Sequence, residues 1–535
     1  MSTPSMTASA PVPATDAASA APHLRRRLER LVPLVLVMLV FLAAVLSITP
    51  WPVGAFVDDA IYTLLAKALA TGEGYRMINL PGAPHATHYP PGYPFVLSLL
   101  WRLSPEFPDN VVVFKFANAV FLAAAAAGVY WFARRRLEFR VVSAAVIAFV
   151  GTATILMLHL AGLVLSEPLF IALLLPALFL VERTVEEGRM RHAIAAGLVL
   201  GALSMVRTLG AVAVGGAVVV LLFRRRYAAA LGLAAAAALF LVPWQLWLSA
   251  YQGETPAILV GKYGAYGPWM MDGYREGGLD FARAVVLKNL VGIGDELGYV
   301  LMPLPRWWPR ILSLIAAAPL LIGGLVLLAR RAPGLAAFLV LYLGVIVIWP
   351  FSPYRFLIAI WPLLVLTAFV AVRALWQWAT RGNPARSLRL AALAPLAYLV
   401  AGHAAYNWVQ YRDETWIVLQ RRAGESAKPL VEWVARYTQP DDLLSTEHDA
   451  TVYLYTGRRG VPTSTFLARQ RVSPFTPDEH VTWVRTMIET FEPRYFITGF
   501  TAHLMAADTL AARTPPVLRR LGAIQNHVVY ERITP

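Results

Sequence analysis

The stretch LVPLVLVMLVFLAAVLSITPWPVGAFVDDAIYTLL, residues 31–65, joins a long apolar run to two adjacent aspartates, Asp58 and Asp59. The apolar part, residues 31–49, has about the length of a helix that spans a bilayer. The Trp-Pro pair that follows it is a poor cleavage site for a signal peptidase. We therefore predict a first membrane helix that is retained, followed by a segment that begins with two carboxylates.

The composition of the whole chain is that of a polytopic α-helical membrane protein. Of its 535 residues, 58% are hydrophobic and 15% are charged, and the mean hydropathy is +0.56. The chain has no cysteine, which excludes disulfides and thiolate metal sites. The net charge of +15 comes from short arginine clusters between apolar runs, a pattern typical of cytoplasmic membrane loops rather than of a nucleic-acid-binding protein.

Eleven apolar runs predict about eleven transmembrane helices and the orientation of the chain. The runs are 31–49, 111–133, 141–158, 163–181, 193–206, 208–223, 228–248, 311–329, 335–349, 356–374 and 389–408. If the N-terminus is cytoplasmic, most of the arginine clusters fall in cytoplasmic loops, as the positive-inside rule requires. We predict a multi-pass protein of the cell (inner) membrane. Residues 1–24, rich in Pro, Ala, Ser and Thr, are predicted to be a disordered cytoplasmic tail.

This orientation places three sizeable segments outside the cytoplasm. Two are loops of the membrane domain 25–408, namely 50–110 and 249–310, and the third is residues 409–535. The last segment alternates helical patterns, such as 478–491, with short strand candidates, such as 443–446. It is predicted to be a soluble extracytoplasmic α/β domain with a small, largely parallel sheet.

The first outside loop contains the strongest candidate for chemistry. An apolar stripe at helical spacing follows the aspartates, which predicts a short amphipathic helix on the membrane surface that stops near Gly72. One interpretation is that Asp58 caps this helix and complements its dipole. The other is that one carboxylate faces a reaction centre, where it accepts a proton from an attacking hydroxyl.

Aromatic and histidine side chains gather in both outside loops of the membrane domain. His88, Tyr89 and Tyr93 surround a Pro-Pro-Gly turn, and Tyr263 and Trp269 lie in the glycine-rich stretch 262–280. Such rings either anchor the chain at the membrane interface or contact a sugar substrate. A divalent metal has no clear ligand motif. His85 and His88 are three residues apart, but Pro84 and Pro90 flank them and make a metal-binding helix unfavourable.

Several short motifs occur together in a recognisable order. The acidic pair is followed by Gly-x-Gly-Tyr at 72–75 and by the Pro-Pro turn, and later by LVLSEPLF (163–170), LSMVRTLG (203–210), WPFSPYRFLIAIWPLL (349–364) and VYLYTGRRGVP (452–462). This order resembles the GT-C membrane glycosyltransferases, in the branch that includes the protein O-mannosyltransferases and the aminoarabinose transferases (family 39-like). Two positions depart from that pattern. Asp59 stands where the family usually has Glu, and Tyr89 stands where many members have a donor-binding lysine.

The resemblance implies an inverting transfer of a sugar from a polyprenyl-phosphate donor to an extracytoplasmic hydroxyl. It implies that Asp58 is the base, assisted by Asp59. The residues expected at the donor phosphate are Arg207, Arg355 and Lys67, and those expected at the substrate are Glu167, His88, Tyr89, Tyr93, Tyr263 and Trp269. Two alternatives are that Arg207 pairs structurally with Glu167 and that Arg355 snorkels to the interface.

A membrane transporter or lipid flippase is the main alternative function. Transporters commonly show internal repeats and charges at mid-bilayer, whereas this chain shows no repeat and its charges cluster at the ends of the apolar runs. The expected partners are the lipid-linked donor and membrane lipids. The acceptor and the sugar are not indicated by the sequence.

Overall fold

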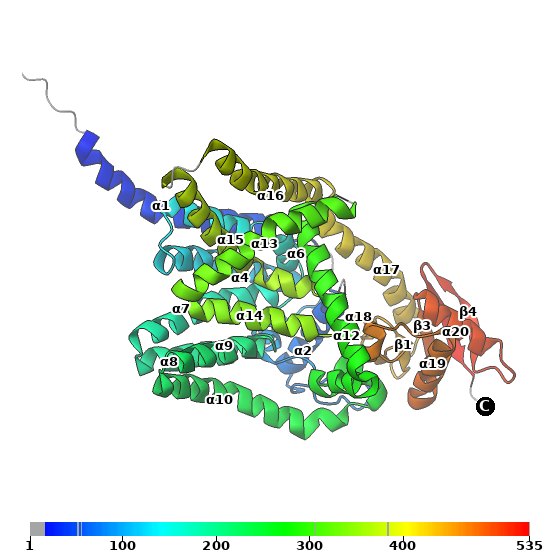
Figure 1. The fold of residues 1–535 in the computed structure, drawn as a ribbon. Coiled ribbons are helices and arrows are strands. Elements are labelled where there is room, and N and C mark those ends of the chain that lie inside the picture. The colour runs from blue at the N-terminus through cyan, green and yellow to red at the C-terminus, as the bar shows by residue number, and fades with distance from the viewer. Residues whose placement is uncertain (1–16, 51–52, 55, 305, 382–384, 534–535) are drawn as a thin grey trace, which may run out of the picture.

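The computed structural model describes residues 17–50, 53–54, 56–304, 306–381 and 385–533. Long apolar helices lie side by side in one body, and the sheet of the C-terminal segment lies beyond one end of these helices (Figure 1). The site described below lies where these two parts meet.

Each predicted apolar run coincides with a helix. These helices are α1 (Ala17–Leu46), α4 (Val111–Arg135), α5 (Val141–Thr152) with α6 (Ile155–Ala161), α7 (Glu167–Glu187), α8 (Met190–Val206), α9 (Gly210–Phe223), α10 (Tyr227–Tyr251), α13 (Trp307–Arg331), α14 (Pro333–Ile348), α15 (Tyr354–Arg381) and α16 (Arg386–Arg412). Within the described ranges, six helices are long and apolar enough to cross a membrane, or seven if the α5–α6 pair, bent by 58°, is one span. Four others are shorter apolar helices, so the count of about eleven crossings stays a prediction.

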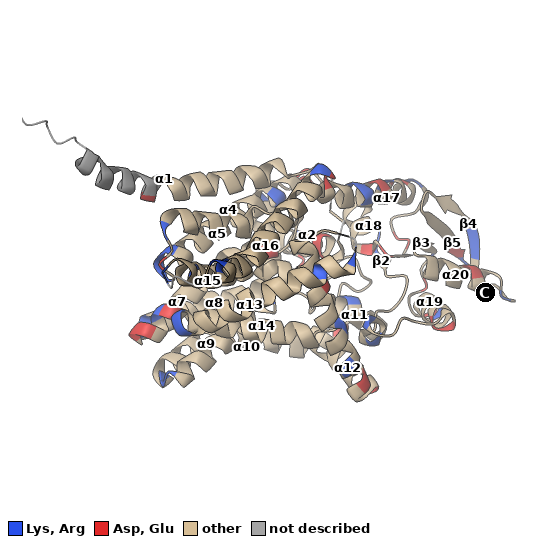
Figure 2. Ribbon diagram, turned by 45° about the horizontal axis from the view of Figure 1, so that its top comes forward, with Lys and Arg blue, Asp and Glu red and all other residues tan. Residues whose placement is uncertain are grey.

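Lys and Arg residues occur at several helix ends that lie away from the C-terminal sheet (Figure 2). Arg134 and Arg135 lie in the last turn of α4, and Arg330 and Arg331 in that of α13. The positive-inside rule predicts such arginine clusters at a cytoplasmic face, so the orientation stays a prediction. Helix α1 begins at Ala17, so the last residues of the predicted disordered tail are helical. The alanine-rich sequence of this segment favours that conformation.

The first outside segment contains α2 (Val57–Ala70) and α3 (Gly92–Leu103). The predicted helix is present, and Gly72 and Gly74 follow it with positive φ, which glycine adopts without strain. The exposure of this helix differs from the prediction. Tyr62 does not belong to the apolar stripe of the predicted surface helix, yet it is only 4% exposed. Helix α2 is therefore buried inside the protein and does not present one open face to solvent.

The second outside segment is largely helical. It contains η1 (Gln252–Glu254), η2 (Ala257–Leu259), α11 (Val260–Tyr263) and α12 (Tyr266–Leu301). The glycine-rich stretch predicted to be a loop forms the first half of α12. Gly278, at φ 53° and ψ −140°, kinks that helix in a backbone region that glycine tolerates.

The C-terminal segment contains a five-stranded sheet and four helices. Its elements are α17 (Thr415–Tyr437), β1 (Leu444–Thr446), α18 (Asp449–Thr456), β2 (Gly460–Val461), η3 (Ala468–Arg471), α19 (Pro477–Phe491), β3 (Tyr495–Thr498), α20 (Thr501–Ala511), β4 (Leu518–Ile524) and β5 (His527–Arg532). The strand order is β2-β1-β3-β5-β4. The prediction of a largely parallel sheet is wrong for half of it, because β5 pairs antiparallel with both β3 and β4. A short turn joins β4 to β5, and such a turn connects antiparallel strands only.

Helices α17 and α18 join the C-terminal segment to the membrane helices. Helix α18 packs on α2, where the ammonium of Lys67 lies 5.1 Å from the ring centroid of Tyr453. On α17, Gln420 Oε1 accepts hydrogen bonds from Thr49 Oγ1 (2.6 Å) and from Lys115 Nζ on α4 (3.2 Å). These contacts fix the C-terminal segment over the helix that carries both aspartates.

Candidate active site

A cavity of about 860 Å³ lies between the membrane helices and the C-terminal segment. Its volume falls within the range of roughly 300–1,000 Å³ that is usual for ligand pockets. Side chains from both parts of the chain line it, including Asp58, Tyr62, His88, Tyr89, Arg207, Lys262, Tyr266, Arg355, Glu447, Asp449, Thr463, Phe500 and His503. The site is therefore assembled from segments several hundred residues apart.

Asp58 lies in the first turn of α2 and faces this cavity. Its Oδ1 accepts a hydrogen bond from the hydroxyl of Tyr89 (2.7 Å), and its Oδ2 accepts one from Arg355 Nη1 (2.6 Å). Burial raises the pKa of Asp58, but the Arg355 guanidinium and the Tyr89 hydroxyl outweigh burial and hold this pKa below its usual value. The carboxylate is therefore ionised at neutral pH and able to accept a proton.

Asp59 has a different environment although it is the next residue. Its side chain is buried and accepts hydrogen bonds from the backbone N–H groups of Gly54 (3.1 Å) and Ala60 (2.8 Å). Burial raises the pKa of Asp59 from 3.8 to about 7. Phe56 is the N-cap residue of α2 and no side chain caps the helix, so the interpretation of Asp58 as the capping residue is wrong.

Glu167 holds two arginines at the cavity wall. It is the first residue of α7 and its side chain is fully buried. Glu167 Oε1 lies 2.7 Å from Arg207 Nη1 and 2.8 Å from Arg355 Nη2. The predicted Arg207–Glu167 pair is thus present, and Arg355 joins it instead of extending to the interface. A buried ion cluster of this kind fixes side-chain positions, because leaving any one charge unpaired is costly.

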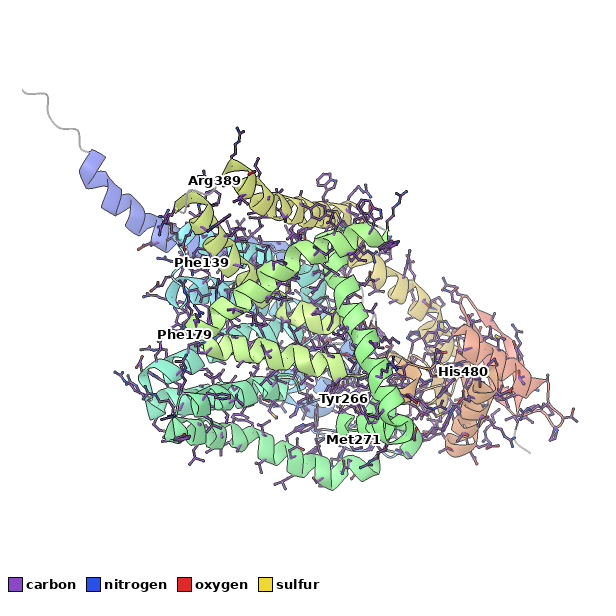
Figure 3. The ribbon with its side chains drawn as sticks, in the orientation of Figure 1. Phe139, Phe179, Tyr266, Met271, Arg389 and His480 are labelled. Atoms are coloured by element: carbon purple, nitrogen blue, oxygen red, sulfur yellow. The ribbon has the colours of Figure 1, made fainter. Side chains whose placement is uncertain are left out.

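Four aromatic rings form the wall beside Asp58. The rings of Tyr62 and Tyr89 lie 4.9 Å apart, and that of His88 lies 4.0 Å from the ring of Tyr266. His88 Nδ1 lies 2.6 Å from the carbonyl oxygen of Gly264, and since a carbonyl only accepts, Nδ1 carries the hydrogen. Burial lowers the pKa of His88 to about 4, so the ring is neutral. Figure 3 shows Tyr266 where α12 passes in front of the membrane helices.

Several residues expected at the donor phosphate or at the substrate do not line this cavity. Lys67 lies against α18, and Tyr93 is fully buried with its hydroxyl bonded to Asn118 (3.1 Å). The Tyr263 hydroxyl donates to Asp449 (2.6 Å), and the Trp269 indole N–H donates to the carbonyl of Phe466 (2.8 Å). None of these four residues is among the described residues that line the cavity, and neither is Glu167. Lys67, expected at the donor phosphate, and the other four, expected at the substrate, therefore support the walls of the cavity and do not line it.

Other lining residues were not predicted from the sequence. Tyr62 lies close to the aspartates in the sequence but off the apolar stripe, so the amphipathic pattern did not indicate a role for it. Its hydroxyl lies 3.3 Å from Ser166 Oγ. Glu447, Thr463 and His503 lie on the C-terminal segment, where no sequence motif distinguishes them. Only the packing of that segment against α2 brings them to the cavity.

No group of three or more histidine and carboxylate side chains in the described part of the chain is arranged to hold a metal ion. Asp58 instead contacts the guanidinium of Arg355, which shares the carboxylate of Glu167 with Arg207. This arrangement offers a carboxylate and two guanidinium groups in one cavity. Such a set is able to remove a proton from a hydroxyl and to stabilise a phosphate.

Comparison with known proteins identifies the fold. No family model and no curated protein matches the sequence. The crystal structure of ArnT from Cupriavidus metallidurans bound to undecaprenyl phosphate matches with a TM-score of 0.52 and 14% identity, over 94% of this chain and 98% of that chain. The apo structure of the same protein matches with a TM-score of 0.49 and 14% identity, over 94% and 97%. The chain therefore has the GT-C fold of the aminoarabinose transferase ArnT, as the order of its sequence motifs indicates.

Proposed function

We propose that this chain is a membrane glycosyltransferase that moves a sugar from a polyprenyl-phosphate donor to a hydroxyl outside the cytoplasm. The observation that carries the proposal is the contact of Asp58 with Arg355 (2.6 Å) at the wall of a large cavity, with Arg207 beside them. The fold of ArnT supports it, because that protein is described with undecaprenyl phosphate bound.

The proposed reaction needs one base and one anion site. The acceptor oxygen attacks the anomeric carbon with inversion while Asp58 takes the hydroxyl proton. The bond between the anomeric carbon and the phosphate oxygen breaks, and the phosphate leaves with that electron pair. Arg207 and Arg355 stabilise the departing anion through charge-assisted hydrogen bonds. The polyprenyl chain keeps the donor at the membrane, beside α2.

The ion cluster also couples donor binding to the strength of the base. Without a ligand, the two arginines are balanced by the carboxylates of Asp58 and Glu167. An incoming phosphate competes with Asp58 for Arg355. Once Arg355 turns to the phosphate, Asp58 loses its nearest positive charge and its pKa rises. Asp58 thereby becomes a stronger base when the donor is bound.

The substitution Asp58→Asn tests this proposal in isolated cell membranes, which supply the acceptor, after labelled undecaprenyl-phosphate sugars are added. We expect wild type to release undecaprenyl phosphate and the variant to be slower by about 10²–10⁴-fold, the usual contribution of a general base. Asp272→Asn, a change at an exposed carboxylate on α12, should transfer at the wild-type rate. Equal rates for wild type and Asp58→Asn would exclude Asp58 as the base, and no use of any such donor would exclude the enzyme class.

A further inference from the structure

The outer half of the cavity differs from the inner half in the charged groups that line it. It is formed by the C-terminal segment and α11, whereas the inner half carries Asp58 and the arginines. Lys262 Nζ lies 2.6 Å from Asp449 Oδ1, so these two charges neutralise each other. The guanidinium of Arg471 lies over the ring of Phe466, 4.6 Å from its centroid. Among the described residues, Glu447 is the one carboxylate of the lining that pairs with no lysine or arginine.

Glu447 is held in place by one of its two oxygens. Its Oε1 accepts hydrogen bonds from the hydroxyl of Thr498 and from the backbone N–H of Phe500 (3.4 Å), and it lies 3.5 Å from His503 Nδ1. The side chain is 7% exposed. Its Oε2 has no hydrogen-bond partner among the residues that the structure describes. A buried acceptor without a partner costs free energy, so a small movement of the side chain that lets a ligand hydroxyl donate to this enclosed oxygen is favoured.

Two further hydroxyl groups and an exposed aromatic ring line the same cavity as this carboxylate. Thr463 Oγ1 lies 2.9 Å from His503 Nδ1, and the neighbouring Ser464 Oγ has no partner within the described ranges. Phe500 is 60% exposed although it lines the cavity, and its ring centroid lies 5.7 Å from that of His503. An apolar ring face beside a carboxylate and hydroxyls matches a sugar ring, which has an apolar face and hydroxyls at its edge.

We infer that the outer half of the cavity binds a neutral sugar residue of the acceptor, with Glu447 accepting its hydroxyls and Phe500 covering its apolar face. The inference rests on the proposed transferase function, for which it names the acceptor class. An anionic acceptor is disfavoured next to Glu447, because no lysine or arginine among the described residues pairs with this carboxylate. The acceptor hydroxyl then enters the same cavity that Asp58 lines.

Saturation-transfer NMR on the full-length chain in lipid nanodiscs tests the sugar site directly. The probes are methyl and hexyl glycosides of mannose, glucose, galactose and arabinose, with glucuronic acid and glucosamine as charged counterparts and empty nanodiscs as the blank. We expect wild type to bind at least one neutral glycoside better than either charged sugar. Stronger binding of the hexyl form assigns the sugar to a glycolipid and equal binding to a soluble glycan, and both results support the site.

Two variants make the test independent of folding defects. Glu447→Gln keeps the shape of the side chain but removes its charge, and Phe500→Ala changes an exposed residue, so each should weaken binding about tenfold. Glu425→Gln, a change at an exposed carboxylate on α17, should bind as wild type. Binding that both Glu447→Gln and Phe500→Ala retain in full, binding of charged sugars only, or no binding of any probe would overturn the site.

The outcomes separate this inference from the proposed function. Asp58→Asn changes the inner half only and should keep full sugar binding while losing transfer. Sugar binding that depends on Glu447 without any transfer activity would support the site and contradict the transferase. Transfer by wild type with unaltered sugar binding in Glu447→Gln and Phe500→Ala would contradict the site alone.

Discussion

At the scale of single residues, Glu167 organises the candidate site without lining it. One carboxylate oxygen contacts both Arg207 and Arg355, and Arg355 in turn contacts Asp58. Glu167 is therefore a positioning residue that acts through the arginines. A second carboxylate on the same helix, Glu182, is equally buried but contacts Arg136 at the other end of α7, far from the cavity.

Glu167→Gln should lower kcat/KM for transfer at least tenfold, because the two arginines lose the charge that holds them together. Removing one partner of a buried ion pair costs about 3–5 kcal/mol of stability. Glu182→Gln is the matched control and should lower the melting temperature by a similar amount while kcat is unchanged. Equal loss of transfer in both variants would show that Glu167 acts only through stability. Thermal unfolding and transfer rates, measured in the same nanodiscs, distinguish the two results.

Asp59 should make stability depend on pH. Its pKa is about 7 in the folded chain and 3.8 for a free aspartate, so between these limits the folded state keeps a proton that the unfolded state has lost. Stability therefore falls as the pH rises from about 4 to 7, by roughly 4 kcal/mol at most, and is constant above that range. Asp59→Asn cannot ionise, so its melting temperature should fall less than that of wild type between pH 5 and pH 8. The same fall in both proteins would contradict this assignment.

At the scale of elements, α11 and the segment that follows β2 form the seam between the two parts of the chain. Gly261 on α11 approaches this segment so closely that an added Cβ would lie 1.6 Å from the carbonyl oxygen of Phe466. Only glycine fits at this position without movement of the backbone. The seam closes the outer half of the cavity, whose lining includes both residues.

Gly261→Ala should therefore separate α11 from the segment around Phe466 and destabilise the protein by about 1–3 kcal/mol, the usual cost of overpacking. Limited proteolysis should then cut the C-terminal segment faster, and transfer should fall. Gly267→Ala on α12 is the control, since its added Cβ meets no atom within 4 Å. This helical substitution should be neutral or slightly stabilising. Equal proteolysis rates for the two variants would show that the seam tolerates a side chain.

At the scale of the whole molecule, the arrangement requires the cavity and the C-terminal segment to lie on one side of the membrane. The basic helix ends lie on the opposite side (Figure 2). The positive-inside rule then predicts that the cavity faces the outside. Under the proposed function, a lipid-linked donor would reach such a site from the outer leaflet without leaving the membrane.

Cysteine labelling tests this orientation, because the chain contains no cysteine of its own. Ser473→Cys, at an exposed position of the C-terminal segment, should react with a membrane-impermeant maleimide on intact spheroplasts. Arg225→Cys, at an exposed position between α9 and α10, should react only after lysis. The reverse pattern would invert the topology and place the cavity in the cytoplasm.

The sequence by itself determined the positions of the helices and the order of the motifs. Apolar runs, glycine stops and arginine clusters act locally, through burial, backbone freedom and charge, so they can be recognised without neighbours in space. The order of the motifs, through its resemblance to the GT-C transferases, pointed to Asp58, Arg207 and Arg355, and all three line the cavity.

Only the tertiary structure decided which side chains meet. Arg355 contacts Asp58 across 297 residues of sequence and Glu167 across 188, and no local pattern encodes such pairs. Burial of α2 beneath α18 places Lys67 against Tyr453, away from the cavity lining, and brings Tyr62 to the cavity wall. It also placed the two adjacent aspartates of the opening stretch in unlike surroundings. Asp58 is paired with a guanidinium, whereas Asp59 is enclosed by backbone N–H groups, because successive positions on a helix face different neighbours.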